Sequence, residues 1–173
     1  MAVRVGILTV SDKGACGERV DTSGQAIREM VASLDATVEH YLVVPDEKEV
    51  IASRLREWAD EAGLDLIITT GGTGLSPRDV TPEATLAVVE RVVPGMAEAM
   101  RQEGLKHTPM AMLSRAVVGV RGRTLIINLP GREQGVRQNL AYLLPVLSHA
   151  LAMLGGEAGD HAATGEGEQG LQG

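Results

Sequence analysis

The side chains best suited to chemistry lie together in one stretch, TTGGTGLSPRDVTPEAT, which runs from Thr69 to Thr85. Its glycines allow a sharp bend or a close approach to a ligand, and Thr81-Pro82 is typical of a helix start. Backbone N–H groups at such a strand–turn–helix junction are free to bind an anion. The candidate site residues in this stretch are Thr70, Gly71, Gly72, Thr73, Gly74, Ser76, Arg78, Asp79 and Thr81.

Charged residues elsewhere extend this candidate site. Arg115 adds a cation, and Asp12 and Asp46 add carboxylates. Hydrogen-bond donors and positive charge suit a phosphate. Carboxylates beside a phosphate suit Mg²⁺, which takes one or two of them together with phosphate oxygens. This set favours phosphoryl or nucleotidyl transfer, because such reactions depend on positioning and charge neutralisation.

A structural role is the alternative for several of these residues. The loop on its own is consistent with a turn capped by Thr81, in which Arg78 and Asp79 form a surface ion pair. Asp46 precedes a predicted helix and, taken alone, is most simply an N-cap. Ser23-Gly24 starts another predicted helix, where it is either a second anion-binding site or only a cap and a packing residue.

Several common motifs are absent from the sequence. Gly72-Thr73-Gly74 lacks the third glycine of a dinucleotide-binding fingerprint, because Pro77 stands in its place, and no Gly-Lys-Ser/Thr triplet marks a P-loop. The histidines have no metal-ligand spacing. A single cysteine, Cys16, excludes an internal disulfide and a thiolate metal cluster within one chain.

The composition narrows the class of protein. The length of 173 residues suits one domain with a real core. A net charge of −7 and a pI near 5.1 disfavour binding to nucleic acid or to an acidic membrane. With no Phe, one Trp and two Tyr, the core must be aliphatic, and stacking platforms for single strands are scarce. No apolar stretch approaches the ~20 residues that span a bilayer, and no signal-peptide pattern is present. We predict a cytoplasmic protein without nucleic-acid or membrane partners.

Apolar runs and helix signals alternate along the chain. Strands are predicted at residues 3–10, 36–44, 64–70, 117–120 and 124–128, the last two joined as a hairpin. Helices are predicted at residues 23–34, 48–62, 82–92, 94–104, 109–115 and 133–154, the last interrupted at Pro145. Residues 11–20 are predicted to be a loop. Residues 155–173 are Gly-rich and acidic and are predicted to form a flexible tail after a domain over residues 1–154.

This alternation predicts an α/β fold whose sheet is mostly parallel, with helices on both faces and a short antiparallel hairpin. In such sheets ligands bind at the carboxyl ends of the strands. Ser11-Asp12, Asp46, the glycine-rich loop and Leu129-Pro130-Gly131 each follow a predicted strand. We therefore expect these four turns to meet at one edge of the sheet.

The stretch from Thr69 to Thr85 resembles the signature loop of the molybdenum cofactor biosynthesis proteins of the MogA/MoaB-like group, the molybdopterin adenylyltransferases. Other family-like segments follow in the expected order, namely LTVSD at 8–12, DTSG at 21–24, VPDE at 44–47, LSR at 113–115 and NLPG at 128–131. The resemblance covers residues 3–154.

The resemblance implies a three-layer α/β/α sandwich that assembles as a homotrimer. It implies that molybdopterin and ATP react with Mg²⁺ to give adenylylated molybdopterin and pyrophosphate, and that the product passes to a molybdenum-insertion protein. It changes Asp46 from a predicted cap to a predicted catalytic and metal-binding residue, together with Asp79. Besides the glycine-rich loop, the expected binding residues are Ser11, Asp12, Ser23, Gly24, Ser114, Arg115, Asn128, Pro130 and Gly131.

One position departs from the family pattern. After NLPG the family often has Pro-Lys, whereas this chain has Glu133-Gln134. A basic contact to an anionic ligand is expected to be lost, and Arg132 is the candidate to replace it. Two alternatives to adenylyl transfer stay open. One is a molybdopterin-binding carrier or scaffold without transferase activity, and the other is a different enzyme with a phosphate substrate, since one fold serves many functions.

Overall fold

A six-stranded sheet with the order β2-β1-β3-β6-β5-β4 forms the centre of the molecule. The structure is a computed structural model that describes residues 2–157. The strands are β1 Val3–Val10, β2 Ala36–Val44, β3 Leu66–Thr70, β4 Arg91–Val92, β5 Val118–Arg121 and β6 Thr124–Leu129. The strands β2, β1, β3 and β6 run parallel, whereas β5 is antiparallel to both β6 and β4. This arrangement confirms the predicted mostly parallel sheet with an antiparallel hairpin.

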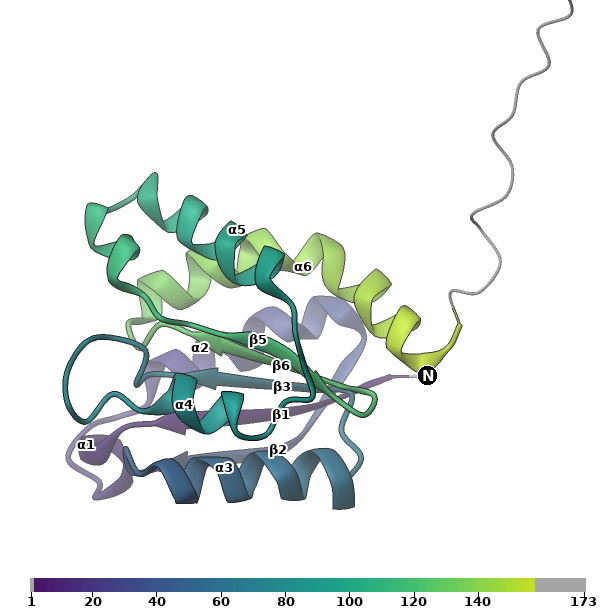
Figure 1. Cartoon of the computed structure of the whole chain (residues 1–173), viewed down its shortest axis with the longest axis horizontal. Helices are drawn as coiled ribbons and strands as arrows, with labels where there is room; N and C mark the ends of the chain where they lie inside the picture. The colour runs from purple at the N-terminus through teal and green to yellow at the C-terminus, as the bar shows by residue number, and fades with distance from the viewer. Residues whose placement is uncertain (1, 158–173) are drawn as a thin grey trace, which may run out of the picture.

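Helices cover both faces of the sheet (Figure 1). The α-helices are α1 Asp12–Ala15, α2 Thr22–Val31, α3 Lys48–Arg56, α4 Thr81–Leu86, α5 Pro94–Leu105 and α6 Glu133–Gly155. Shorter helical turns are η1 Ala32–Leu34, η2 Glu57–Glu61 and η3 Pro109–Leu113. Buried residues of α2, α5 and α6 pack on one face, and those of α3 and α4 pack on the other. The fold is therefore the predicted three-layer α/β/α sandwich.

The central strands alternate their side chains between the two cores. In β3, Leu66 and Ile68 join the core under α2 and α6, while Ile67 between them joins the core under α3. All five residues of β3 are buried, as expected for a parallel strand covered on both faces. The continuous apolar run in the sequence thus reflects burial on two sides.

The structure differs from the sequence predictions in residues 82–92 and in residues 11–20. The helix predicted over residues 82–92 ends at Leu86 in the structure, and β4, Arg91–Val92, follows it. The pairing of β4 with β5 is a tertiary contact that the local helical pattern does not show. The loop predicted over residues 11–20 contains α1, whose N-cap Ser11 accepts a hydrogen bond from the N–H of Gly14 at 3.0 Å.

The predicted interruption of the last helix at Pro145 is wrong, because α6 runs through it from Glu133 to Gly155. Pro145 lies on the exposed side of this helix, and Leu143 and Leu147 beside it are buried. The carbonyl that loses its helical partner is therefore on the solvent side, where water can satisfy it. Of the predicted tail, only residues 155–157 lie within the described part of the chain. No helix within residues 2–157 is long and apolar enough to cross a membrane.

Candidate active site

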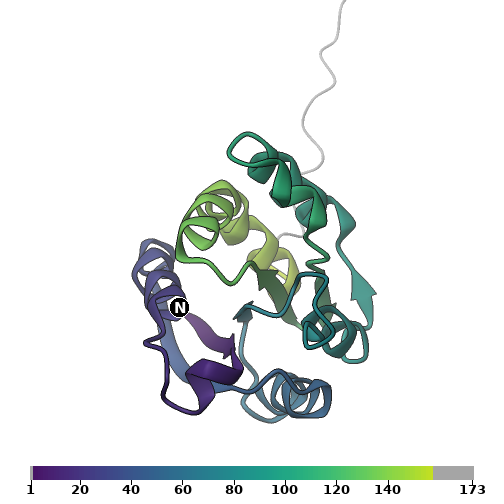
Figure 2. The ribbon, with the colours of Figure 1, turned by 90° about the vertical axis from the view of Figure 1, so that its left-hand side faces the viewer.

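A cavity of about 940 Å³ opens at the carboxyl ends of the parallel strands, the edge that faces the viewer in Figure 2. The turns after β1, β2, β3 and β6 all contribute to its lining. The structure therefore brings the four predicted turns together. The predicted site residues that line the cavity are Ser11, Ser23, Asp46, Thr70, Gly71, Gly72, Thr73, Gly74, Asp79, Ser114, Pro130 and Gly131.

The loop after β3 presents backbone N–H groups to this cavity. Gly71 and Gly72 have φ values of +97° and +69°, a conformation that favours glycine. Among residues 2–157, the N–H groups of Gly72, Thr73 and Gly74 donate no hydrogen bond to the protein. Successive unpaired N–H groups in such a turn form an anion-binding concavity. The loop therefore offers N–H groups that can donate to an anion such as a phosphate.

Thr81 supports the loop from behind. It is fully buried and is the first residue of α4 rather than its cap. Its hydroxyl donates to the carbonyl oxygen of Gly71 at 2.9 Å, and its N–H donates to the carbonyl oxygen of Gly72 at 3.1 Å. Thr81 does not line the cavity; it holds the two glycines in place.

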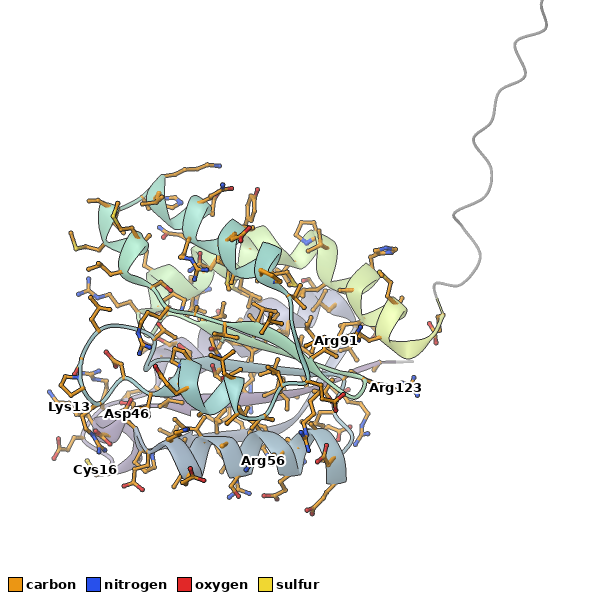
Figure 3. The ribbon with its side chains drawn as sticks, in the orientation of Figure 1. Lys13, Cys16, Asp46, Arg56, Arg91 and Arg123 are labelled. Carbon is orange, nitrogen blue, oxygen red and sulfur yellow. The ribbon has the colours of Figure 1, made fainter. Side chains whose placement is uncertain are left out.

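The two predicted catalytic acids lie beside different glycines of the loop. Asp46 follows β2 at the left-hand edge of the molecule in Figure 3, and its Oδ1 is 3.3 Å from the position that a Cβ on Gly72 would occupy. Asp79 Oδ2 is 2.9 Å from the equivalent position on Gly74 and accepts a hydrogen bond from the N–H of Ser76 at 2.9 Å. Within residues 2–157, no three His, Cys, Asp or Glu side chains gather to hold a metal on their own.

Burial raises the pKa of Asp46 above its usual range, and the neighbouring carboxylates of Asp12 and Asp79 add to this shift. The N–H of Asp12 and the charge of Arg78 act in the opposite direction. Since the folded pKa is raised, the fold favours the protonated form. The stability that this group contributes is present at low pH and is lost as the pH rises through its folded pKa.

We therefore expect Asp46→Asn to melt at a higher temperature than the wild type at pH 7, with the difference shrinking toward pH 4. Asp60→Asn is the matched control, because the guanidinium of Arg121 holds the pKa of Asp60 below its usual range. That variant should show no gain in stability over the wild type at pH 7, because its ion pair is half-exposed and contributes little to stability. Thermal unfolding across this pH range measures the melting temperatures of both variants. An Asp46→Asn protein that is less stable than the wild type at pH 7 would contradict the raised pKa of Asp46.

Neither of the two predicted basic residues lines the cavity. Arg115 Nε donates to the carbonyl oxygen of Gly74 at 2.8 Å, and its Nη2 donates to that of Asp79 at 2.8 Å. Its remaining Nη1 pairs with Glu83. Arg78 pairs with Asp12, at 2.8 Å between Nη2 and Oδ1, so the surface pair between Arg78 and Asp79 does not form. Arg115, Arg78 and Asp12 are all absent from the cavity lining.

Ser23 and Gly24 have separate roles at the start of α2. Ser23 Oγ donates to the carbonyl oxygen of Gly131 at 2.6 Å and lines the cavity. Gly24 donates its N–H to Asp21 Oδ1 at 2.9 Å, so Asp21 is the N-cap of α2. A Cβ on Gly24 would lie 2.2 Å from Asp21 Oδ2. The structure thus places Gly24 in a packing role and Ser23 at the site.

Asn128 lies behind the cavity in the core. It is fully buried, and its Nδ2 donates to Thr69 Oγ1 at 3.0 Å and to Thr85 Oγ1 at 2.9 Å. Its Oδ1 accepts from the N–H of Val117 at 3.1 Å. It therefore joins β6 to β3, to α4 and to the segment before β5, and it does not line the cavity.

We expect Asn128→Leu to reduce the free energy of unfolding by about 2 kcal/mol, because buried polar partners lose their hydrogen bonds. Urea denaturation provides the measurement. Asn139→Leu is the control, because the buried Oδ1 of Asn139 has no partner in the described structure. Equal losses in the two variants would show that the hydrogen bonds of Asn128 are not the cause.

The wall opposite the glycine-rich loop was not predicted. It carries polar side chains from α5, from the segment after it and from α6, namely Arg101, His107, Gln138 and Asn139. Arg19, from the segment between α1 and α2, also lines the cavity. No local motif marks Arg101, His107, Gln138 and Asn139, since they meet at the site because α5 and α6 pack side by side.

Comparison with known proteins places the chain in a family. Residues 6–149 match a domain family described as a "probable molybdopterin binding domain". The chain belongs to this family. The molybdopterin adenylyltransferase of Helicobacter pylori strain J99 is 40% identical over 154 residues, which are 88% of each chain. The Escherichia coli K12 protein of the same name is 42% identical over 141 residues, 80% of this chain and 72% of its own.

A solved structure of the same family shows the same fold. The crystal structure of the molybdopterin biosynthesis enzyme MoaB from Thermus thermophilus has 60% sequence identity to this chain and a TM-score of 0.85. The match covers 89% of this chain and 97% of that protein. These relatives confirm the predicted MogA/MoaB-like family and its α/β fold.

The position at which this family member departs from the expected pattern lies at the cavity. Arg132, Glu133 and Gln134 all line it. Glu133 Oε1 accepts hydrogen bonds from Arg137 at 3.2 and 3.1 Å, which offsets the charge of this carboxylate. Arg132 forms no salt bridge with any residue in the range 2–157. Its position at the cavity is consistent with the predicted replacement of the lost basic contact.

Proposed function

We propose that this member of the molybdopterin-binding family is a Mg²⁺-dependent molybdopterin adenylyltransferase of molybdenum cofactor biosynthesis. One observation carries the proposal. Asp46 and Asp79 lie beside a loop in which three N–H groups donate to none of residues 2–157, at a cavity whose size of about 940 Å³ suits small-molecule substrates. The activity named for relatives at about 40% identity supports it.

In the proposed reaction, an oxygen of the terminal phosphate of molybdopterin attacks the α-phosphorus of ATP. A new P–O bond joins the two substrates, and the bond from the α-phosphorus to the oxygen bridging to the β-phosphate breaks. Pyrophosphate leaves with the electron pair of that bond. The N–H groups of Gly72, Thr73 and Gly74 would stabilise charge that develops on the phosphate oxygens.

The donor set fits Mg²⁺. This ion takes one or two carboxylates and completes its coordination with phosphate oxygens and water. Among residues 2–157, no third His, Cys, Asp or Glu joins Asp46 and Asp79 in a closed metal cage. Asp46 and Asp79 would hold the ion, whose charge would neutralise that of the phosphates.

The carrier alternative differs in one measurable property, the binding of ATP. Calorimetric titration with ATP in the presence of Mg²⁺ should show saturable binding, and chelation of the metal should weaken it. The absence of any binding at millimolar Mg-ATP, with molybdopterin binding retained, would overturn the proposed transfer and favour a carrier.

We also propose that the chain assembles as a homotrimer and that its product passes to a molybdenum-insertion protein, as the family resemblance implies. Large apolar side chains are exposed along α5, along η3 and on α6, and they support an assembly interface: Leu105, Met110, Met112, Leu113, Tyr142 and Val146. Light scattering that shows only monomers at micromolar concentrations would contradict the trimer.

A further inference from the structure

Two aspartates and an arginine form a closed hydrogen-bonded group at the edge of the cavity. The N–H of Asp46 donates to Asp12 Oδ1 at 3.0 Å, and the N–H of Asp12 donates to Asp46 Oδ2 at 2.9 Å. Arg78 donates to both oxygens of Asp12, from Nε to Oδ2 at 3.0 Å and from Nη2 to Oδ1 at 2.8 Å. The group joins the start of α1, the turn after β2 and the loop after β3.

We propose that Asp12 and Arg78 form a clasp that positions the carboxylates of Asp46 and Asp79, and that Asp12 is a positioning residue rather than a metal ligand. The proposal rests on the proposed adenylyl transfer. Arg78 immediately precedes Asp79, so the clasp ties the loop that carries Asp79 to the turn that carries Asp46. It therefore constrains where the two acids lie relative to each other.

The oxygens of Asp12 are already used within the protein. Oδ1 accepts from both Asp46 and Arg78, and Oδ2 accepts from Arg78. Arg78 therefore occupies both oxygens of the Asp12 carboxylate. Asp46, by contrast, directs Oδ1 toward Gly72 and lines the cavity. The two neighbouring aspartates thus have different roles.

The exposure of the clasp separates a positioning role from a structural one. The side chains of Arg78 and Asp12 are 58% and 43% exposed, and exposed ion pairs contribute little to stability. Loss of the clasp should therefore leave the melting temperature nearly unchanged. Its effect should fall on the placement of the reacting groups, where a small displacement lowers the rate strongly.

The test compares Arg78→Gln, Asp12→Asn and the double variant. Each single variant should lower kcat/KM for Mg-ATP by about 10- to 100-fold, and the double variant should be no worse than the more damaged single one, because each opens the same clasp. Arg121 and Asp60 provide a control pair with the same bidentate geometry outside the cavity. Arg121 donates from Nε to Asp60 Oδ1 at 2.9 Å and from Nη2 to Asp60 Oδ2 at 2.7 Å. Arg121→Gln and Asp60→Asn should leave activity unchanged.

A second measurement needs neither substrate nor metal. Backbone hydrogen exchange of the N–H groups of Asp12 and Asp46 should be faster in Arg78→Gln than in the wild type. Additive losses, with Asp12→Asn far more damaging than Arg78→Gln, would show that Asp12 contacts metal or substrate and would overturn the proposal. Unchanged exchange would also overturn it. If exchange is faster in Arg78→Gln but the wild type shows no transferase activity, only the proposed adenylyl transfer is refuted. The clasp would then be retained as the contact that positions the two acids.

Discussion

Asp79→Asn is expected to lower the rate of adenylyl transfer by about 10³-fold or more, because an acid that holds charge beside the transferring phosphate is lost. The asparagine oxygen can still accept the hydrogen bond that the N–H of Ser76 donates to Asp79 Oδ2 at 2.9 Å. The hydrogen bonds that Arg115 makes to the backbone of this loop also remain. The turn should therefore keep its conformation, and the lower rate should result from the missing negative charge of Asp79.

Turnover is measured as pyrophosphate released from Mg-ATP with molybdopterin present. Circular dichroism and thermal unfolding should show an intact fold for Asp79→Asn. Asp60→Asn makes the same substitution at an exposed carboxylate outside the cavity, and it should keep wild-type turnover. Near-normal turnover in Asp79→Asn would remove Asp79 from the catalytic machinery.

Gly71→Ala is expected to reduce the free energy of unfolding by about 3 kcal/mol or more. The added Cβ would lie 2.3 Å from the backbone oxygen of Val10, and the φ of +97° is unfavourable for alanine. A left-handed conformation costs about 1–2 kcal/mol, and overpacking adds about 1–3 kcal/mol. The obstacle is backbone of β1, which cannot move without disturbing the sheet, so the glycine-rich loop should be displaced as well.

Gly17→Ala separates the two contributions to this loss. Gly17 has a φ of +81°, and among residues 2–157 no heavy atom beyond Gly17 and its two chain neighbours lies within 4 Å of its Cβ position. This control should therefore lose only the conformational part, about 1–2 kcal/mol. Urea denaturation of both variants gives the difference. Equal losses would show that the contact with Val10 is not responsible.

The strands, most helices and the glycine-rich loop could be predicted from local patterns of apolar, glycine and helix-capping residues in the sequence. Strands such as β3 are buried on both faces and leave continuous apolar runs. The convergence of Ser11, Asp46 and the glycine-rich loop followed from topology, because parallel strands end at one edge. The assignment of Asp46 needed the family resemblance, since its position before a helix also suits a cap.

The other features of the fold and of the candidate site could not be predicted from the sequence, because they depend on contacts between residues that are distant in the chain. The strand β4 is only two residues long and exists because it pairs with β5. Whether a polar residue faces ligand or protein also depends on such contacts. Arg115 holds the loop backbone and Asn128 joins buried elements, although both stand in family-like motifs. The wall with Arg101 and His107 arises from helix packing and leaves no spacing pattern.

Pyrophosphate release from Mg-ATP by the wild-type protein, with and without freshly prepared molybdopterin, tests adenylyl transfer most directly. We expect release only when molybdopterin is present, with one adenylylated molybdopterin formed for each pyrophosphate. No release despite measurable molybdopterin binding would contradict the transferase and would direct attention to Glu133 and Gln134 at the cavity wall.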